Sequence, residues 1–268
     1  MEALRQVDAW PVGTAAVGVA AARVPATTHG DVTARLPWAS VTKLATALAA
    51  LVAAEEGTID LDEPAGPPGS TIRHLLAHAS GLPPDADKPI AKPGTRRIYS
   101  NAGFEVLAET VAERADMHFA DYLRQAVLEP LSQSATLAGS PASGLEGTLA
   151  DLLALGSELL APTVVASETL LEATAVAFAG LVGVLPGYGR MDPNDWGLGF
   201  ELRDEKRPHW TGQANSPQTF GHFGQSGGFL WVDPQAGLAC ACLTDAGFGD
   251  WAKEAWPQLA DAVLAEAA

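Results

Sequence analysis

One long apolar run, residues 40–56, constrains the fold more than any other part of the sequence. Gly57 follows it, at a position where helices commonly end in the left-handed conformation. Within the run, apolar side chains recur at helical spacing at Leu44, Leu48, Leu51 and Val52. A helix that is apolar nearly all round must be buried between other layers. The rest of the chain is therefore expected to pack around this helix on several sides.

Two reactive side chains, Ser40 and Lys43, stand at the start of the run. Residues three apart on a helix are neighbours, so a hydroxyl and an amine would meet near the positive end of the helix dipole. A serine at a helix start is most often only a cap, and a short Ser-x-x-Lys pattern also occurs by chance. However, Lys43 is the only one of the five lysines that follows a serine at this spacing. In apolar surroundings its pKa would fall, and a neutral, proton-accepting amine would become accessible.

The two ends of the sequence carry the strand signals. Short apolar segments bounded by turn residues predict strands over residues 13–22, 196–202, 228–233 and 237–244. Residues 29–31 are expected to form a turn after the first strand, and residues 233–237 a hairpin between the last two. A final helix over residues 251–267 would pack on the sheet, so both chain ends are expected to build one antiparallel sheet flanked by helices.

The middle of the sequence is predicted to be mostly helical, with helices over residues 70–83, 101–114, 119–128, 148–160 and 167–179. A Pro/Gly-rich crossing at residues 63–69 marks a boundary between lobes. We therefore predict one α/β (α+β) domain over residues 1–268. Its sheet lobe would combine residues 1–66 with 190–268, and a mostly helical inserted lobe would span residues 67–189.

Composition excludes several kinds of partner. The 268-residue chain has a formal net charge of −16, which would repel phosphate backbones and anionic lipid, so neither nucleic acid nor a membrane is expected as a partner.

Residues 1–8 lack the basic and apolar regions of a signal peptide, which favours a cytoplasmic location. Cys240 and Cys242 would point to the same face of a strand as packed thiols, and no disulfide is expected.

Two further segments could complete a site around Ser40. Tyr99-Ser100-Asn101 lies on a predicted turn before a helix, where a phenol and an amide can project into a cleft, although a packed tyrosine with a capping residue is the simpler interpretation. His222-Phe223-Gly224-Gln225 approaches a strand through glycines that permit close contact with a bound acyl group. A nucleophile needs a base and oxyanion donors, and these segments supply candidates for both.

Taken in order, these three segments resemble the three motifs of the penicillin-recognising serine hydrolases, in the branch of class C β-lactamases, D,D-peptidases and family VIII esterases. Flanking stretches at residues 71–83, 128–131 and 144–151 also agree with that family, so the resemblance covers nearly the whole chain. It implies a β-lactamase/transpeptidase-like fold, a small-molecule acyl substrate, and neither a cofactor nor a metal. The oligomeric state stays open.

The resemblance also implies roles for individual residues. Ser40 would be the acylated nucleophile, Lys43 and Tyr99 the proton-transfer pair, and Asn101 a ligand for substrate or for Lys43. The N–H groups of Ser40 and Gln225 would form the oxyanion hole. The residues expected to bind substrate are Asn101, His222, Phe223, Gly224 and Gln225.

The third motif departs from the family pattern. His222 replaces the lysine of Lys-Thr-Gly, and Phe223 replaces its hydroxyl-bearing residue. In the family pattern, the lysine ammonium and the hydroxyl help to hold the carboxylate of a penicillin, and this sequence lacks both groups at these positions. With Phe229 and Trp231 expected near the cleft, the sequence favours hydrolysis of short-chain or aryl esters over β-lactams. Esters, amides and β-lactams all remain possible substrates.

Three alternatives stay open at this point. Residues 224–228 match the Gly-x-Ser-x-Gly elbow of α/β-hydrolases, with Ser226 as nucleophile, but no histidine follows His222 in the sequence. His74 and His78 have the spacing of a metal pair but lack an obvious third ligand, so a structural role is preferred. The chain could also be a catalytically silent member of the family that serves as a binding or assembly protein.

Overall fold

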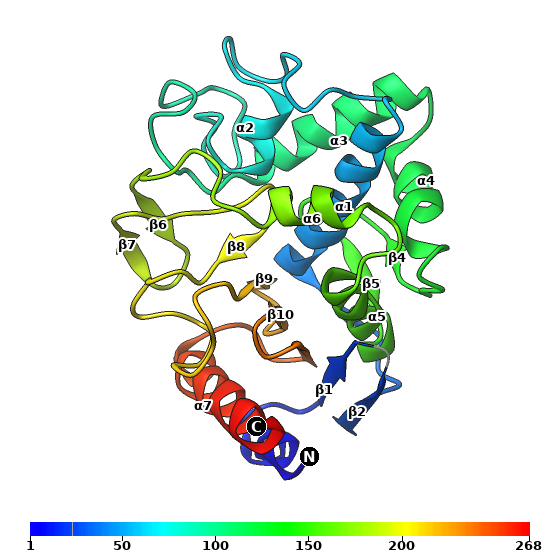
Figure 1. Cartoon of the computed structure of the whole chain (residues 1–268), viewed down its shortest axis with the longest axis vertical. Coiled ribbons are helices and arrows are strands. Elements are labelled where there is room, and N and C mark those ends of the chain that lie inside the picture. The colour runs from blue at the N-terminus through cyan, green and yellow to red at the C-terminus, as the bar shows by residue number, and fades with distance from the viewer. Residues whose placement is uncertain (23) are drawn as a thin grey trace.

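Strands from both ends of the chain form one six-stranded antiparallel sheet in the computed structural model, which describes residues 1–22 and 24–268 (Figure 1). The order across the sheet is β2 (Val24–Gly30), β1 (Ala15–Ala21), β11 (Leu238–Thr244), β10 (Phe229–Asp233), β9 (Phe220–Phe223) and β8 (Glu201–Leu202). Every neighbouring pair is antiparallel. The predicted fold class, an antiparallel sheet flanked by helices, is therefore confirmed.

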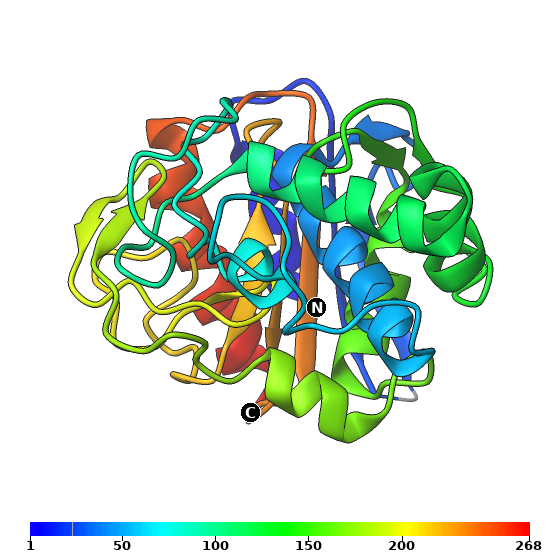
Figure 2. The same cartoon turned by 90° about the horizontal axis from the view of Figure 1, so that it is seen from above.

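Alternation along the strands divides the core into two layers. Cys240 and Cys242 on β11 face a cluster that includes Trp256 of α7 (Asp250–Ala267), whereas Ala239 and Ala241 face the cluster that contains α5 (Leu149–Leu160). The short helix η1 (Glu2–Ala9), which the sequence analysis did not predict, packs against α7. Both cysteines are free and buried, as expected. Helices thus cover both faces of the sheet (Figure 2).

The apolar run forms the buried helix α1 (Thr42–Glu55), whose residues from Thr42 to Ala53 are all buried. The regular helix begins two residues later than predicted, because Ser40 lies in a preceding 3-10 turn, η2 (Ala39–Val41). Ala39 there has a φ of 45°, a left-handed conformation that is uncommon for a residue with a side chain. Ser40 is therefore presented on a tight turn immediately before the helix.

The middle of the chain contains the predicted helices α3 (Asn101–Ala115) and α4 (Phe119–Leu123), the latter continued by a π-helical turn, η3 (Arg124–Leu128). Two others are shorter than predicted: α2 (Ile72–Leu76) and α6 (Ser167–Ala173). The carbonyl of Ala173 accepts the N–H of Leu198, which ends α6 early. Small sheets link these helices: β3 (Leu36–Pro37), β5 (Leu145–Gly147) and β4 (Thr136–Leu137) form one, and β6 (Gly183–Leu185) and β7 (Gly189–Met191) form another.

The division into two lobes stays a prediction, although α5, from the range assigned to the inserted lobe, packs on β1, β10 and β11. Two local expectations were wrong. The turn predicted at residues 29–31 begins later, because β2 extends to Gly30. The strand predicted over residues 196–202 is reduced to β8, with Trp196 making only isolated bridges, to Ala177 and to Glu201. Among the described residues, no helix combines the length and apolar character needed to cross a bilayer.

Candidate active site

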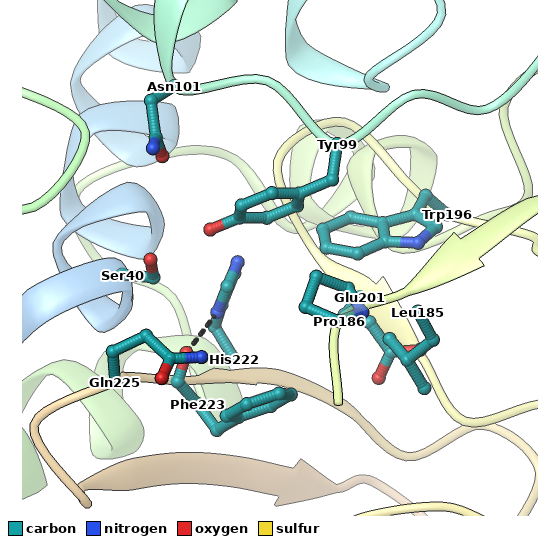
Figure 3. A pocket seen from close by; sticks show the side chains of 10 residues that line it. All are labelled: Ser40, Tyr99, Asn101, Leu185, Pro186, Trp196, Glu201, His222, Phe223 and Gln225. Atoms are coloured by element: carbon teal, nitrogen blue, oxygen red, sulfur yellow. Dashed lines mark hydrogen bonds between the residues drawn. The ribbon is translucent and has the colours of Figure 1, made fainter. Parts of the chain in front are cut away.

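Three segments that lie far apart in the sequence meet at one pocket (Figure 3). Ser40 comes from the turn before α1, Tyr99 and Asn101 from the loop and first residue leading into α3, and His222 from β9. The pocket encloses about 110 Å³ and is lined by Ser40, Tyr99, Asn101, Leu185, Pro186, Trp196, Glu201, His222, Phe223 and Gln225. All of the expected site residues except Lys43 and Gly224 line this pocket, and Gly224 lies between the lining residues Phe223 and Gln225 in the chain.

Lys43 is wholly buried beneath the pocket. Its Nζ lies 3.5 Å from Ser40 Oγ and donates hydrogen bonds to Asn101 Oδ1 at 2.7 Å and to the carbonyl of Ala142 at 2.9 Å. Burial lowers the pKa of Lys43 to about 7, although the carboxylates of the neighbourhood oppose this shift. Near neutral pH the amine is therefore available in its uncharged form, held beside the serine hydroxyl.

Tyr99 lies on the loop before α3, with its hydroxyl directed toward Ser40 (Figure 3). Burial raises the pKa of the Tyr99 phenol far above its ordinary value, and the hydrogen-bonding contact with Ser40 opposes this only in part. Ser100 caps the helix: its Oγ accepts the N–H of Gly103 at 2.9 Å. This cap fixes where α3 begins, and hence where Asn101 faces Lys43.

His78 holds this loop in place. Its backbone carbonyl accepts the N–H of Ile98 at 2.9 Å, and its ring Nδ1 accepts the N–H of Ser100 at 3.1 Å. The His78 ring also packs 4.7 Å from the ring of Tyr99, measured between centroids. His78 therefore has the structural role that was preferred for it, because its Nδ1 is used by the loop backbone.

His222 presents an unprotonated nitrogen to the pocket. Its Nδ1 donates to the carbonyl of Phe223 at 2.7 Å, which requires the proton to be on Nδ1. Burial lowers the pKa of His222 to about 3, so the ring is neutral. Its Nε2 is buried and has no hydrogen-bond partner among the described residues. Unlike a lysine ammonium, this group can accept a hydrogen bond from a substrate but cannot donate one.

Phe223 lies at the edge of the site, with most of its ring in the core. Only 5% of its surface is exposed, and the ring packs against Phe248 and Trp256 beside α7. Phe229 and Trp231 belong to the same buried cluster, so the expectation that they border the cleft was wrong. Strand alternation turns both of them toward α7, away from Ser40.

The backbone beside the nucleophile is tightly packed. A Cβ on Gly224 would approach the carbonyl oxygen of Trp38 to 2.5 Å, so only glycine fits between the end of β9 and the turn that carries Ser40. In the part of the chain that the structure describes, the N–H groups of Ser40 and Gln225 donate to no protein acceptor. Two backbone donors next to the serine are therefore free for a ligand.

Four lining residues were not singled out from the sequence: Leu185, Pro186, Trp196 and Glu201. Glu201 is wholly buried, and its carboxylate accepts hydrogen bonds from Lys206 Nζ, His209 Nε2 and Trp210 Nε1. Burial alone would raise the pKa of Glu201, but His209 and Lys206 outweigh it and hold the pKa below its usual value. The sequence did hold a signal for these residues, namely the tryptophans and charged residues clustered near residues 196–210. A carboxylate within an apolar strand is rare, and it indicates a buried polar site.

The two competing sites are not supported. Ser226 lies in the turn between β9 and β10, whereas a nucleophile elbow joins a strand to a helix. His74 Nδ1 contacts Thr71 Oγ1 at 2.9 Å in a capping box, and its ring stacks on Phe178. No group of three or more potential metal-ligating side chains occurs in residues 1–22 and 24–268.

Comparison with known proteins agrees with this arrangement. A family model described as Beta-lactamase matches residues 6–264. The chain belongs to the β-lactamase family. A solved structure of a β-lactamase (Mb2281c) from Mycobacterium bovis is 54% identical, with a TM-score of 0.97, and the match covers 99% of each chain. The resemblance drawn from the three motifs is therefore confirmed. No curated protein matches this β-lactamase-family chain.

More distant structures in the comparison share the fold. EstCE1, a hydrolase with promiscuous acyltransferase activity, is 17% identical with a TM-score of 0.79 over 98% of this chain and 97% of its own. Unliganded simvastatin synthase (LovD) from Aspergillus terreus is 16% identical with a TM-score of 0.79 over 99% of this chain and 97% of its own. At these identities the similarity extends to the fold alone.

Proposed function

We propose that this β-lactamase-family chain is a serine hydrolase that acts through an acyl-enzyme on Ser40, with a preference for esters of short, apolar acids. The observation that carries the proposal is the buried amine of Lys43, 3.5 Å from Ser40 Oγ and with a pKa lowered to about 7. A charged amine in such a place is costly, and structural roles seldom require one.

The contacts of Lys43 suit a general base. A neutral amine has two N–H bonds and one lone pair, and the hydrogen bonds to Asn101 Oδ1 and the Ala142 carbonyl use both N–H bonds. The lone pair is left for the hydroxyl of Ser40. Lys43 would take the proton as Oγ attacks the acyl carbon, and the C–O bond of the tetrahedral intermediate would then break.

Tyr99 is suited to donate a proton and not to act as the base. Its raised pKa keeps the phenol protonated at neutral pH, so a phenolate is not accessible for attack. The phenol can pass its proton to the leaving alcohol while it receives the proton held by Lys43. Water would then attack the acyl-enzyme by the reverse sequence and release the acid.

The N–H groups of Ser40 and Gln225 would bind the oxyanion. Both flank the pocket, and neither is used elsewhere among the described residues. Preorganised backbone donors of this kind supply a large share of the catalysis of acyl transfer. The close approach of Gly224 to the turn of Ser40 brings the two donors together.

The lining of the pocket favours a small apolar acyl group. Leu185, Pro186, Trp196 and Phe223 supply apolar walls, and a volume of about 110 Å³ is below the roughly 150 Å³ of a cavity that binds benzene. The third motif offers no cation, because His222 is neutral and its N–H is already used. The buried carboxylate of Glu201 also lines the pocket, which disfavours an anionic acyl donor.

The test is chemical labelling of the folded protein with a fluorophosphonate, followed by intact-mass and peptide analysis. One adduct on Ser40 is expected, with none on Ser40→Ala. The rate of p-nitrophenyl acetate hydrolysis by Ser40→Ala should fall to about a thousandth of the wild-type rate or less. Ser226→Ala is the matched control, and we expect it to keep both labelling and activity. An unlabelled wild-type protein, correctly folded, would instead support the catalytically silent alternative.

A further inference from the structure

A second cavity lies beside the active-site pocket and is lined by different chemistry. It encloses about 690 Å³ between the loop that follows β8, the turn between β6 and β7, and α7. In Figure 1 this loop lies directly over α7. Its basic lining residues, which define what we call the basic cavity, are Arg203, Lys206, Arg207, His209 and Lys253.

The charge of the basic cavity contrasts with the rest of the chain. The sequence has 16 lysines and arginines against 32 aspartates and glutamates, and four of the 16 line this one cavity. Two acidic residues, Glu254 and Asp261, also line it. Asp261 Oδ1 accepts the N–H of Ala214 at 2.8 Å, so part of the hydrogen-bonding capacity of this carboxylate is already used. Lys253 pairs with Asp250 only at the exposed surface of α7.

Arg203 and Arg207 form the strongest part of the positive lining. Arg203 is 5% exposed, and its guanidinium donates to three backbone carbonyls, those of Gly212, Asp204 and Gln213. Burial lowers the pKa of Arg203, and the neighbouring charge of Arg207 lowers it further. Within the described residues, neither guanidinium lies within 4.0 Å of a carboxylate oxygen. The carboxylates of Glu205, Asp261 and Asp233 oppose the lowering of the pKa of Arg203 from farther away. Two like charges are thus held near each other, and no carboxylate is in direct contact with either.

Uncharged polar residues complete the lining. The side chain of Gln213, on the loop after β8, is exposed and can donate to a ligand. Thr211 Oγ1 already bonds His209 Nδ1 at 2.8 Å. The Tyr188 hydroxyl has no hydrogen-bond partner among the described residues, but it is enclosed by protein and does not face the open cavity.

From this combination we propose that the basic cavity is a binding site for the phosphate group of a small phosphate monoester. A dianion would offset the repulsion between Arg203 and Arg207, and its three terminal oxygens could accept from the exposed side chains of Arg207 and Gln213. Lys206 and His209 contribute to the charge of the lining, but their donors are already bonded within the protein. The cavity also has room for an organic substituent on the phosphate. A carboxylate offers only one negative charge and two oxygens, so it would balance the positive charge of Arg203 and Arg207 less well.

The basic cavity is linked to the active site through one carboxylate. Lys206 and His209 line the basic cavity and both bind Glu201, which lines the active-site pocket. The turn between β6 and β7 also divides the two, because Leu185 and Pro186 face the active site while Gly187 and Tyr188 face the basic cavity. A bound phosphate would therefore lie one residue layer from the acyl pocket.

The experiment is a titration of the full chain with inorganic phosphate and with phenyl phosphate at constant ionic strength, read by 31P resonance broadening and by the melting temperature. We expect one site, with a dissociation constant of about 1 mM or below for phenyl phosphate. Arg207→Gln should weaken binding by about tenfold to a hundredfold, because a charged hydrogen bond is lost. Arg207 is exposed, so this variant should fold normally, which its melting temperature without ligand will check.

Arg190→Gln is the matched control, since Arg190 is an exposed arginine on β7 outside the basic cavity. It should bind both ligands as the wild type does. Equal weakening by Arg190→Gln and Arg207→Gln would mean that only the overall charge matters, and the proposal would fail. It would fail equally if neither ligand bound at tens of millimolar, or if benzoate bound more tightly than phenyl phosphate. None of these measurements depends on hydrolysis by Ser40.

Discussion

His78 fixes Tyr99 by holding the peptide groups on both sides of it. The N–H of Ile98 donates to the His78 carbonyl at 2.9 Å, and the N–H of Ser100 donates to His78 Nδ1 at 3.1 Å. The backbone of His78 has a φ of 53°, and its ring is only 1% exposed. The residue that positions the phenol is therefore outside the three motifs that carry the chemistry.

We expect His78→Ala to lower kcat for ester hydrolysis by more than tenfold while Ser40 remains reactive. The substitution leaves the buried N–H of Ser100 without a partner, which costs about 1–3 kcal/mol and loosens the loop that carries Tyr99. Steady-state kinetics and fluorophosphonate labelling measure the two effects separately.

His78→Asn offers a partial rescue, because its amide oxygen can accept the same N–H. His74→Ala, on the preceding helix α2, is the control, since His74 contacts Thr71 and Phe178 but not Tyr99. If His78→Asn and His78→Ala lose the same activity, the hydrogen bond to Ser100 is not what positions Tyr99.

The pH dependence follows from Lys43. Because neutral Lys43 is the proposed base and its pKa is lowered to about 7, kcat/KM should rise about tenfold per pH unit below 7 and level off above it. The raised pKa of Tyr99 means that no second rise should occur near pH 10. A profile that continues to climb to pH 10 would instead identify the phenolate as the base.

The same lowered pKa makes a prediction about stability. Lys43 has a pKa of about 7 when folded and about 10.5 as a free side chain, so between these values the unfolded chain binds more protons. Unfolding free energy should therefore rise with pH from about 7 to 10.5, by at most about 1.4 kcal/mol per unit. Lys43→Met lacks this dependence, so its stability relative to wild type should fall steadily across that range. Lys88→Met, at an exposed position, should show a constant difference in denaturant titrations.

The parts of the site that could be predicted from the sequence are those encoded locally. Ser40 and Lys43 are neighbours because of a spacing of three, and Ser100 caps α3 because a polar side chain precedes an apolar helix. The shared face of Cys240 and Cys242 follows from strand alternation alone. In each case the pattern within a few residues determines the geometry.

The remaining parts depend on contacts between distant segments. Trp196 and Glu201 line the pocket because the chain between them bends, whereas their sequence pattern resembled one continuous strand. Phe229 and Trp231 face α7 because this helix covers their side of β10. Strand periodicity shows that the two residues share a face of the sheet, but it does not show which face borders the active site. The left-handed turn at Ala39, which presents Ser40, has no glycine to mark it.

Enlarging the acyl pocket should change the preferred chain length. Leu185 is 1% exposed and lines the pocket, so Leu185→Ala should raise the ratio of kcat/KM for p-nitrophenyl octanoate over acetate by about tenfold, at a stability cost of about 2–5 kcal/mol. Val184→Ala, at the exposed neighbouring position, should leave the ratio unchanged. An unchanged ratio in Leu185→Ala would show that the acyl chain lies elsewhere.

The third motif should decide between esters and β-lactams. His222 is neutral and donates its only N–H to the carbonyl of Phe223, so nothing in this motif can hold a carboxylate. We expect wild type to prefer p-nitrophenyl butyrate to a chromogenic cephalosporin. The double substitution His222→Lys/Phe223→Thr supplies an ammonium and a hydroxyl, each worth a hydrogen bond to the carboxylate. It should shift the ratio of specificity constants toward the cephalosporin by about tenfold to a hundredfold.

Stability must be separated from specificity in this experiment. Phe223 packs with Phe248 and Trp256, so truncation of its ring should cost up to about 3–5 kcal/mol, less for a larger replacement. The ratio of two substrates on one protein preparation is independent of the fraction that is folded, which is why the prediction is made for the ratio. Phe223→Leu, with His222 kept, is the matched control and should lower stability without moving the ratio. If the control shifts the ratio as far as the double variant does, the aromatic ring itself sets the preference, and the missing charge at position 222 does not.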